Sequence, residues 1–93
     1  MAVLNDIGAL IVRDPELRSG RPVLAGTGVS VRSVVIRYKQ GQTPEEIADR
    51  FGHLSLAQVY AALTYYHANR EEIEADIAEE DQLYDRLELR INL

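Results

Sequence analysis

Two neighbouring segments in the middle of the chain repeat their apolar residues at helical spacing. The repeats are three and four residues apart, so each set falls on one helical face: Ile47, Ala48 and Phe51 in the first segment, and Val59, Ala62, Leu63 and Tyr66 in the second. Gly52, between them, suits the left-handed residue that ends a helix. The pattern predicts two helices packed against each other within residues 43–66, as in a helix-turn-helix.

Polar residues mark where these two helices begin. Thr43 and Glu46 are spaced for a capping box around Pro44, which suits a first helical position because it has no amide hydrogen to satisfy. Ser55 and Gln58 repeat this spacing twelve residues later. The sequence thus predicts one helix from Pro44 and another directly after Ser55.

The front of the chain is divided into short apolar runs by proline and glycine. Residues 10–12 and 23–24 are typical of two short strands in a hairpin. Residues 25–30 (AGTGVS) lack the lysine of a phosphate-binding loop, so we interpret them as a turn. Ser30 can then cap a helix over residues 31–40, whose inward positions are expected to be Val31, Val34, Val35 and Tyr38.

Beyond the second helix an apolar stripe continues at heptad spacing. Counted in steps of seven from Val59 and from Leu63, eight of ten positions are apolar, with Arg70 and Glu80 as the exceptions. No glycine or proline interrupts residues 56–93, so we expect one long helix that leaves the domain. The small domain is not expected to bury this stripe. The helix is therefore expected to pair with a second copy or to lie in a partner's groove.

These elements predict a mainly α protein, with a small helix-turn-helix-like domain, a short N-terminal β-hairpin and a long acidic C-terminal helix. We divide it into a helix-turn-helix-like domain over residues 1–70 and an acidic amphipathic helical tail over residues 71–93. A chain of 93 residues buries about 60–65% of its unfolded surface, which allows one modest core. A plain helix pair in a small all-α core is the alternative interpretation.

Charge is distributed unevenly along the chain, whose net charge is −5. Residues 1–44 hold six Lys or Arg and three Asp or Glu, whereas residues 45–93 hold four Arg and twelve Asp or Glu. We therefore expect the halves to face different partners, a nucleic acid or acidic surface at the front and a basic protein at the back. A solvated helix face is the alternative explanation of the acidic run.

Residue types needed for catalysis are scarce. The chain has no cysteine, and His53 and His67 lack acids at ligand spacing, so we expect no metal site, no cofactor and no enzymatic activity. The N-terminus lacks the basic segment of a signal peptide, and its apolar stretch is too short to span a membrane. We expect a soluble cytoplasmic protein.

A series of short motifs runs in order along residues 11–68: D-P, G-x-P-V, G-T, V-R before a helix, G-x-T-P-E-E-I, H-L-S and A-x-L. In this combination the chain resembles the family called domain of unknown function 433. The resemblance implies a small helix-turn-helix-like domain, many members of which look like VapB-type antitoxins encoded beside PIN-like ribonuclease toxins. Gly28 stands where the family usually has an arginine after G-T, so any role of that arginine does not transfer.

We expect the domain to bind operator DNA as a homodimer or higher homo-oligomer through its second helix. Residues 56–69 contain no Lys or Arg, so phosphate contacts have to come from neighbouring elements. Ala61 is expected to share the exposed face of this helix. The expected DNA-binding residues are Arg32, Arg37, Arg50, Ser55, Gln58 and Tyr65.

The tail is expected to neutralise a PIN-like ribonuclease, whose phosphate-binding cleft is positive and therefore complementary to an acidic helix. The expected toxin-binding residues are Ile73, Ile77, Glu79, Glu80, Asp81, Tyr84 and Leu87. One alternative is a structural or assembly protein that oligomerises through the C-terminal helix. Another is a transcription regulator without a toxin.

Overall fold

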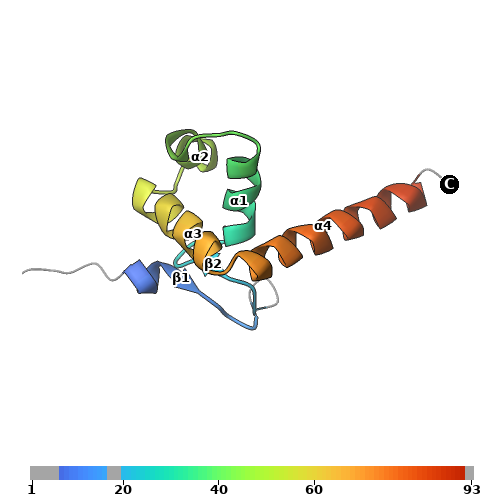
Figure 1. Ribbon diagram of the computed structural model, residues 1–93, viewed down its shortest axis with the longest axis horizontal. Helices are drawn as coiled ribbons and strands as arrows, with labels where there is room; N and C mark the ends of the chain where they lie inside the picture. Colours follow the sequence, from blue (N-terminus) through green and yellow to red (C-terminus); the bar gives the residue numbers. More distant parts are fainter. Residues whose placement is uncertain (1–6, 17–19, 92–93) are drawn as a thin grey trace, which may run out of the picture.

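The computed structural model describes residues 7–16 and 20–91 of the 93-residue chain, and its side chains over residues 8–16 and 20–81. The elements follow in the order η1 (Ile7–Leu10, a 3-10 helix), β1 (Ile11–Val12), β2 (Val23–Leu24), α1 (Val31–Lys39), α2 (Pro44–Phe51), α3 (Leu56–Ala68) and α4 (Arg70–Ile91). Figure 1 shows α1, α2 and α3 gathered into one body, with η1 and β1 beside α3, and α4 extending away from that body. The predicted mainly α fold with a short N-terminal hairpin is confirmed.

The hairpin forms at the two expected apolar runs. β1 and β2 pair antiparallel, and the opposed residues are Ile11 with Leu24 and Val12 with Val23. The chain then turns at Gly26, whose φ of 76° favours glycine. The amide of Leu24 donates to the carbonyl of Val29 (2.8 Å) across this turn. The segment before α1 is therefore a turn, as predicted.

Both predicted capping boxes are present. In α2 the Thr43 hydroxyl accepts a hydrogen bond from the Glu46 amide (3.2 Å), and the Glu46 carboxylate accepts one from the Thr43 amide (2.9 Å). In α3 Ser55 and Gln58 make the same two bonds at 3.1 and 2.8 Å. Gly52 ends α2 with a φ of 77°. These local bonds determine both helix starts, which the sequence predicted correctly.

α3 and α4 are separate helices, so the prediction of one helix over residues 56–93 is wrong. α3 ends at Asn69, whose φ of −134° and ψ of 47° lie outside the helical region. The side-chain amide of Asn69 donates to the carbonyl of Tyr65 (3.1 Å), which also accepts a hydrogen bond from the backbone amide of Asn69 (2.9 Å). α4 then starts in a new direction (Figure 1). No described helix combines the length and apolar composition needed to cross a membrane.

The core lies between α1, α2 and α3, and α4 also contributes to it. Ile73, in the first turns of α4, is fully buried in the same cluster as the core residues of the other helices: Val31, Val34, Val35, Ile47, Val59, Ala62, Leu63 and Tyr66. Tyr38 was predicted to face inward but is 39% exposed, because it lies in the last turn of α1 at the edge of the packed body. Ile77 packs partly against the cluster. The first half of α4 is thus part of the domain.

Candidate functional site

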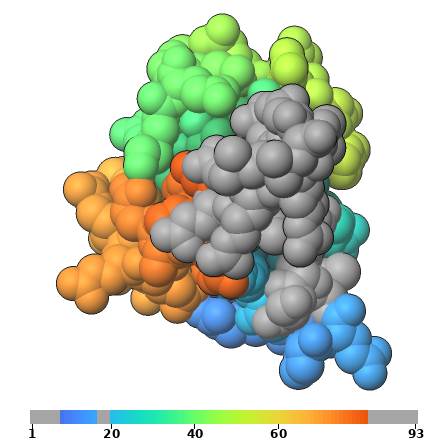
Figure 2. Space-filling model, turned by 90° about the vertical axis from the view of Figure 1, so that its right-hand side faces the viewer, coloured from blue at the N-terminus to red at the C-terminus, as the bar shows by residue number. Residues whose placement is uncertain are grey.

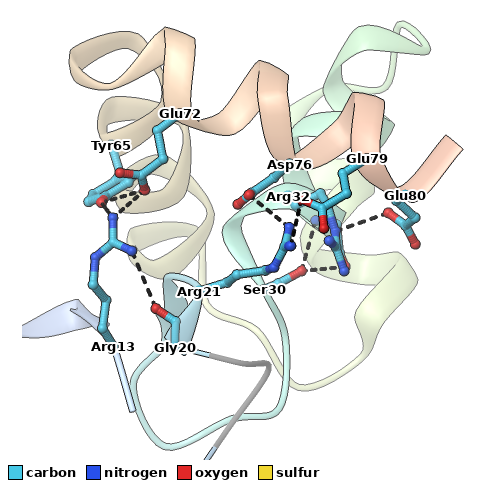
Figure 3. A network of polar contacts seen from close by, with 11 residues as sticks. Arg13, Gly20, Arg21, Ser30, Arg32, Tyr65, Glu72, Asp76, Glu79 and Glu80 are labelled. Carbon is cyan, nitrogen blue, oxygen red and sulfur yellow. Dashed lines mark hydrogen bonds and ion pairs between the residues drawn. The ribbon is translucent and has the colours of Figure 1, made fainter. Parts of the chain in front are cut away.

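The first half of α4 lies against a row of basic side chains from the rest of the domain. Its paired carboxylates form the acidic face: Glu72, Glu74, Asp76, Glu79 and Glu80. The cations opposite them form the basic bed: Arg13, Arg21, Arg32 and Lys39. Figure 3 shows the three arginines reaching toward α4 from below the helix. The acidic face therefore has its partners within the molecule.

Arg13 joins the start of α4 to α3. Its guanidinium pairs with the Glu72 carboxylate and donates to the Tyr65 hydroxyl (2.6 Å), and that hydroxyl in turn donates to Glu72 (2.9 Å). Partial burial raises the pKa of Tyr65, and the bond to Glu72 raises that pKa further. Arg13 also donates to the carbonyl of Gly20 (3.3 Å). One side chain thus links the segment after β1 to both helices.

Arg21 and Arg32 bind the next turns of α4. Arg21 bridges two carboxylates, with Nη1 2.8 Å from Asp76 and Nη2 2.8 Å from Glu79. Arg32, in the first turn of α1, places Nε 3.0 Å from Glu80. The side chains of Arg21, Asp76 and Arg32 are only 25%, 15% and 16% exposed. Solvent and salt therefore screen the Arg21–Asp76 contact less than they screen a fully exposed pair, whereas Glu79 and Glu80 are 67% and 47% exposed.

Glu74 joins α4 to both α1 and α3. Nζ of Lys39 lies 2.6 and 3.0 Å from its two carboxylate oxygens, and the Tyr66 hydroxyl donates to it at 2.7 Å. The bonds from Lys39 and Tyr66 hold the pKa of Glu74 below its usual value. The same carboxylate raises the pKa of Lys39 and that of Tyr66. Glu74 is thus stabilised in its charged form.

The basic front and the acidic back of the chain bind each other, so the expectation that they face different partners is wrong for the described ion pairs. Arg13 and Glu72 are 59 residues apart in sequence, and Lys39 and Glu74 are 35 apart. These distant opposite charges meet because the chain changes direction at Asn69 and the first half of α4 packs beside α1 and α3. Much of the charge that suggested two partners is neutralised internally.

The apolar residues predicted to anchor a toxin differ in where they lie. Ile73 has no exposed surface and belongs to the domain core, so its assignment as a toxin contact is corrected. Ile77 is partly buried beside it. The apolar stripe was expected to remain unburied by the small domain, but the first half of α4 packs this part of it against α1 and α3.

The remaining predicted toxin contacts lie further along α4. Glu79 and Glu80 are already bound to arginines of the basic bed, whereas Asp81 is exposed. Tyr84 and Leu87 lie on the last turns of α4, and their side chains fall outside the described residues. In Figure 2, seen from the end toward which α4 extends, the orange-red first half of α4 is bordered by α1 in green and by the rest of the domain.

The arginines predicted to contact DNA phosphates differ in their surroundings. Arg32 is paired with Glu80. Arg37, further along α1, lies over the ring of Phe51, with its guanidinium carbon 5.3 Å from the ring centre. Arg50 is exposed in the last turn of α2.

The side chains predicted to read bases are engaged in local structure. Ser55 and Gln58 form the capping box of α3, and the Tyr65 hydroxyl binds Glu72. Ala61 was expected to be exposed, but it is only 5% exposed because it lies on the side of α3 that packs against η1 and β1. The described geometry therefore presents no prepared base-reading face on α3.

The surface beside the start of α3 is acidic. A hollow of about 560 Å³ between α2 and α3 is lined by the carboxylates of Glu45, Glu46 and Asp49 and by the apolar Leu54 and Leu56. Carboxylates at this position repel a phosphate backbone that approaches α3. No three His, Asp or Glu side chains among the described residues are arranged to hold a metal ion.

Sequence analysis assigned none of the four cations to α4, and it expected Arg32 to contact DNA. Arg13 and Arg21 lie outside helices, so no periodicity relates them to the acids they bind. A usable signal was the spacing of Glu72, Asp76 and Glu79, which places three acids on one side of a helix that has no base between residues 71 and 80.

Comparison with known proteins identifies the body on which α4 lies. The family model described as "Protein of unknown function (DUF433)" matches residues 11–66, more than half of the chain. The chain belongs to the DUF433 family. A similar solved structure is the crystal structure of a DUF433 member protein from Anabaena variabilis ATCC 29413, with 27% sequence identity and a TM-score of 0.71. The similarity covers 75% of this chain and 69% of that one. A search of curated proteins gives no match.

The DUF433 match divides the paired charges into two groups. It runs from β1 to the last turn of α3, so it contains the whole basic bed. α4 and its acidic face lie beyond it. In this DUF433 protein, therefore, a helix outside the matched region is attached to the family domain by ion pairs and by Ile73.

Proposed function

We propose that this DUF433 protein is the antitoxin of a type II toxin-antitoxin system, and that the part of α4 beyond Asp81 binds a PIN-like ribonuclease in the cytoplasm. The protein acts by binding and carries out no catalysis itself. The observation that carries the proposal is that α4 continues well past the body that covers its first turns (Figure 1). The choice of a PIN-like ribonuclease as the partner rests on the family resemblance.

The sequence of α4 supports this division of the helix. Tyr84, seven residues or about two helical turns after Ile77, continues the stripe whose first members in α4 are the buried Ile73 and the half-buried Ile77, and Leu87 and Ile91 follow at steps of three and four. The proximal part of the stripe is covered by the domain itself. Apolar residues that continue the same stripe beyond the domain suit a groove on another protein.

Electrostatics contributes less to this binding than the acidic composition suggested. The five carboxylates of the acidic face are bound to the domain, and residues 81–91 carry only three acids and two arginines. Affinity therefore comes mainly from the apolar stripe, while Asp81, Asp85 and Glu88 assist approach to a basic ribonuclease. Operator binding through α3 is not included, because side-chain geometry gives it no support.

The near balance of charge in residues 81–91 favours one alternative function. Two copies of this segment would repel each other only weakly when paired. An assembly protein that oligomerises through distal α4 is therefore the second candidate. A substitution on the distal stripe distinguishes the two functions. If the protein is an antitoxin, the substitution weakens binding to the nuclease. If it is an assembly protein, the substitution reduces the size of the oligomer in the absence of any nuclease.

The decisive experiment is Leu87→Asp in the full chain, co-expressed with the PIN-like nuclease that the proposal requires beside this gene. Arg86→Gln is the matched control, since residue 86 is adjacent to Leu87 but off the stripe. Leu87→Asp is expected to weaken nuclease binding about 30-fold or more, as loss of a hot spot of about 2 kcal/mol does, and to abolish neutralisation. Equal co-purification of the two variants contradicts the proposal, and loss of oligomers without the nuclease supports the assembly function.

A further inference from the structure

α3 is unusual for this protein because none of its own residues is charged, although Leu56 at its start borders the hollow lined by Glu45, Glu46 and Asp49. Residues 56–68 contain no Asp, Glu, Lys or Arg, in a chain of which 27% is charged. Leu56 and Tyr60, four residues apart and therefore on one side of the helix, are 43% and 50% exposed. They form what we call the α3 ridge. Large apolar side chains placed together in the open mark a contact surface more often than isolated ones do.

A groove runs beside this ridge, between α3 and the first strand. It has a volume of about 520 Å³, and most of its lining is apolar or small: Ile11, Val12, Ala61, Thr64, Tyr65 and Ala68. Val12, at its edge, is 40% exposed. The same face thus presents both an apolar projection and an apolar hollow.

We propose that two copies of this chain associate through this face about a two-fold axis, the α3 ridge of each lying in the groove of the other. A two-fold interface uses the same patch on both subunits, so a patch that contains both ridge and groove can complement itself. Ala61, Thr64 and Ala68 are small, which lets a side chain of the other copy approach α3 closely.

Charge selects a second copy as the occupant. Two chains of net charge −5 repel each other wherever their charged surfaces meet, and like charges placed opposite one another across an interface lower its stability. Along the groove, from Tyr60 to Ala68, α3 adds no charge, so the repulsion between two copies is smaller there than beside the acidic hollow at Leu56. Arg13, the charged residue at the groove, is already paired with Glu72. A strongly basic or acidic partner therefore finds no unpaired charge among the residues that line this groove.

This inference is independent of the proposed function, because it concerns α3 and not distal α4. A dimer formed in this way covers the outer face of α3, so that helix cannot read bases in the same state. The two distal α4 segments remain outside the contact and are both available to a partner.

The experiment is sedimentation equilibrium of the full chain over a range of concentrations. The wild type is expected to show a concentration-dependent dimer, and Tyr60→Glu, which places two like charges in the interface, is expected to weaken it about tenfold or more. Ala75→Glu is the matched control: residue 75 is exposed on α4 and belongs to neither the ridge nor the lining of the groove. This control is expected to dimerise as the wild type does.

Thr64→Glu, at an exposed residue that lines the groove, provides a second disruption in case Tyr60→Glu alters the fold, which circular dichroism reports. Its dimer is also expected to be weaker. A wild type that stays monomeric at every concentration overturns the inference, as does a dimer that survives both substitutions. A dimer lost in Leu87→Asp but retained in Tyr60→Glu overturns it too, and assigns the contact to α4. Nuclease binding by a Tyr60→Glu monomer leaves the proposed function intact.

Discussion

Ile73 shows how one residue decides where the domain ends. Periodicity alone puts it on the same stripe as Leu87, but its side chain is fully buried among residues of α1 and α3. Ile77, one turn later, is only partly buried. A heptad pattern reports that a face is apolar and not what covers it. The break at Asn69, which the absence of glycine and proline concealed, brings Ile73 back to the core.

Ile73→Ala is therefore expected to destabilise the isolated protein, because it leaves a cavity in the core. The loss in free energy of unfolding is about 2–5 kcal/mol, the range for large-to-small changes at buried aliphatic residues. Ile77→Ala, the control at a partly buried position of the same stripe, is expected to lose clearly less. Urea unfolding followed by circular dichroism measures both. Equal and small losses would show that the first turns of α4 do not belong to the core.

At the scale of elements, the attachment of α4 combines a few apolar contacts with a row of ion pairs. The starts of α1, α2 and α3 were readable from sequence because caps join residues three apart, such as Thr43 and Glu46, whereas the start of α4 was not. The pairing of Arg13 with Glu72 was not readable, because it depends on where a loop and a helix meet in space. The hairpin was also predictable from sequence. Its apolar runs and turn residues are local signals, and the pairing of its strands followed from them.

The ion pairs give the protein a defined pH dependence. The pKa of Glu74 is lowered by Lys39 and Tyr66, so its contribution to stability is present above the ordinary carboxyl value of 4.5 and is lost as the pH falls through its folded pKa. The pKa of Lys39 is raised by Glu74, so its contribution is present below 10.5 and is lost as the pH rises through the folded value. The melting temperature is therefore expected to fall both at acidic pH, where Glu74 is protonated, and at strongly basic pH, where Lys39 loses its charge.

Glu74→Gln tests this assignment in thermal unfolding scans at a series of pH values. It is expected to lower the melting temperature at neutral pH and to reduce the part of the acid-induced loss that comes from Glu74. Glu71→Gln, at an exposed carboxylate outside the acidic face, is the control and is expected to follow the wild type. Identical pH profiles for the two variants would mean that Glu74 does not hold α4 to the domain.

At the scale of the whole molecule, the folded protein hides charges that the linear sequence displays. The sequence predicted the fold class correctly because caps, turn residues and periodicity are local signals. It predicted the partners less well because charge along a chain says nothing about which charges meet after folding. Arg32, expected to bind phosphate, binds Glu80 instead. The surfaces that we propose for partners are the outer face of α3 and the distal part of α4.

Hydrogen exchange along α4, measured on the full chain alone and with the nuclease, tests the central claim most directly: that the first half of α4 belongs to the domain and the second half to a partner. Alone, the amides of residues 74–80 are expected to exchange as slowly as those of α1, and those beyond Asp81 faster. Adding the nuclease is expected to slow exchange only beyond Asp81. The claim is contradicted if residues 74–80 exchange as fast as the rest of α4, or if the nuclease leaves the second half unchanged.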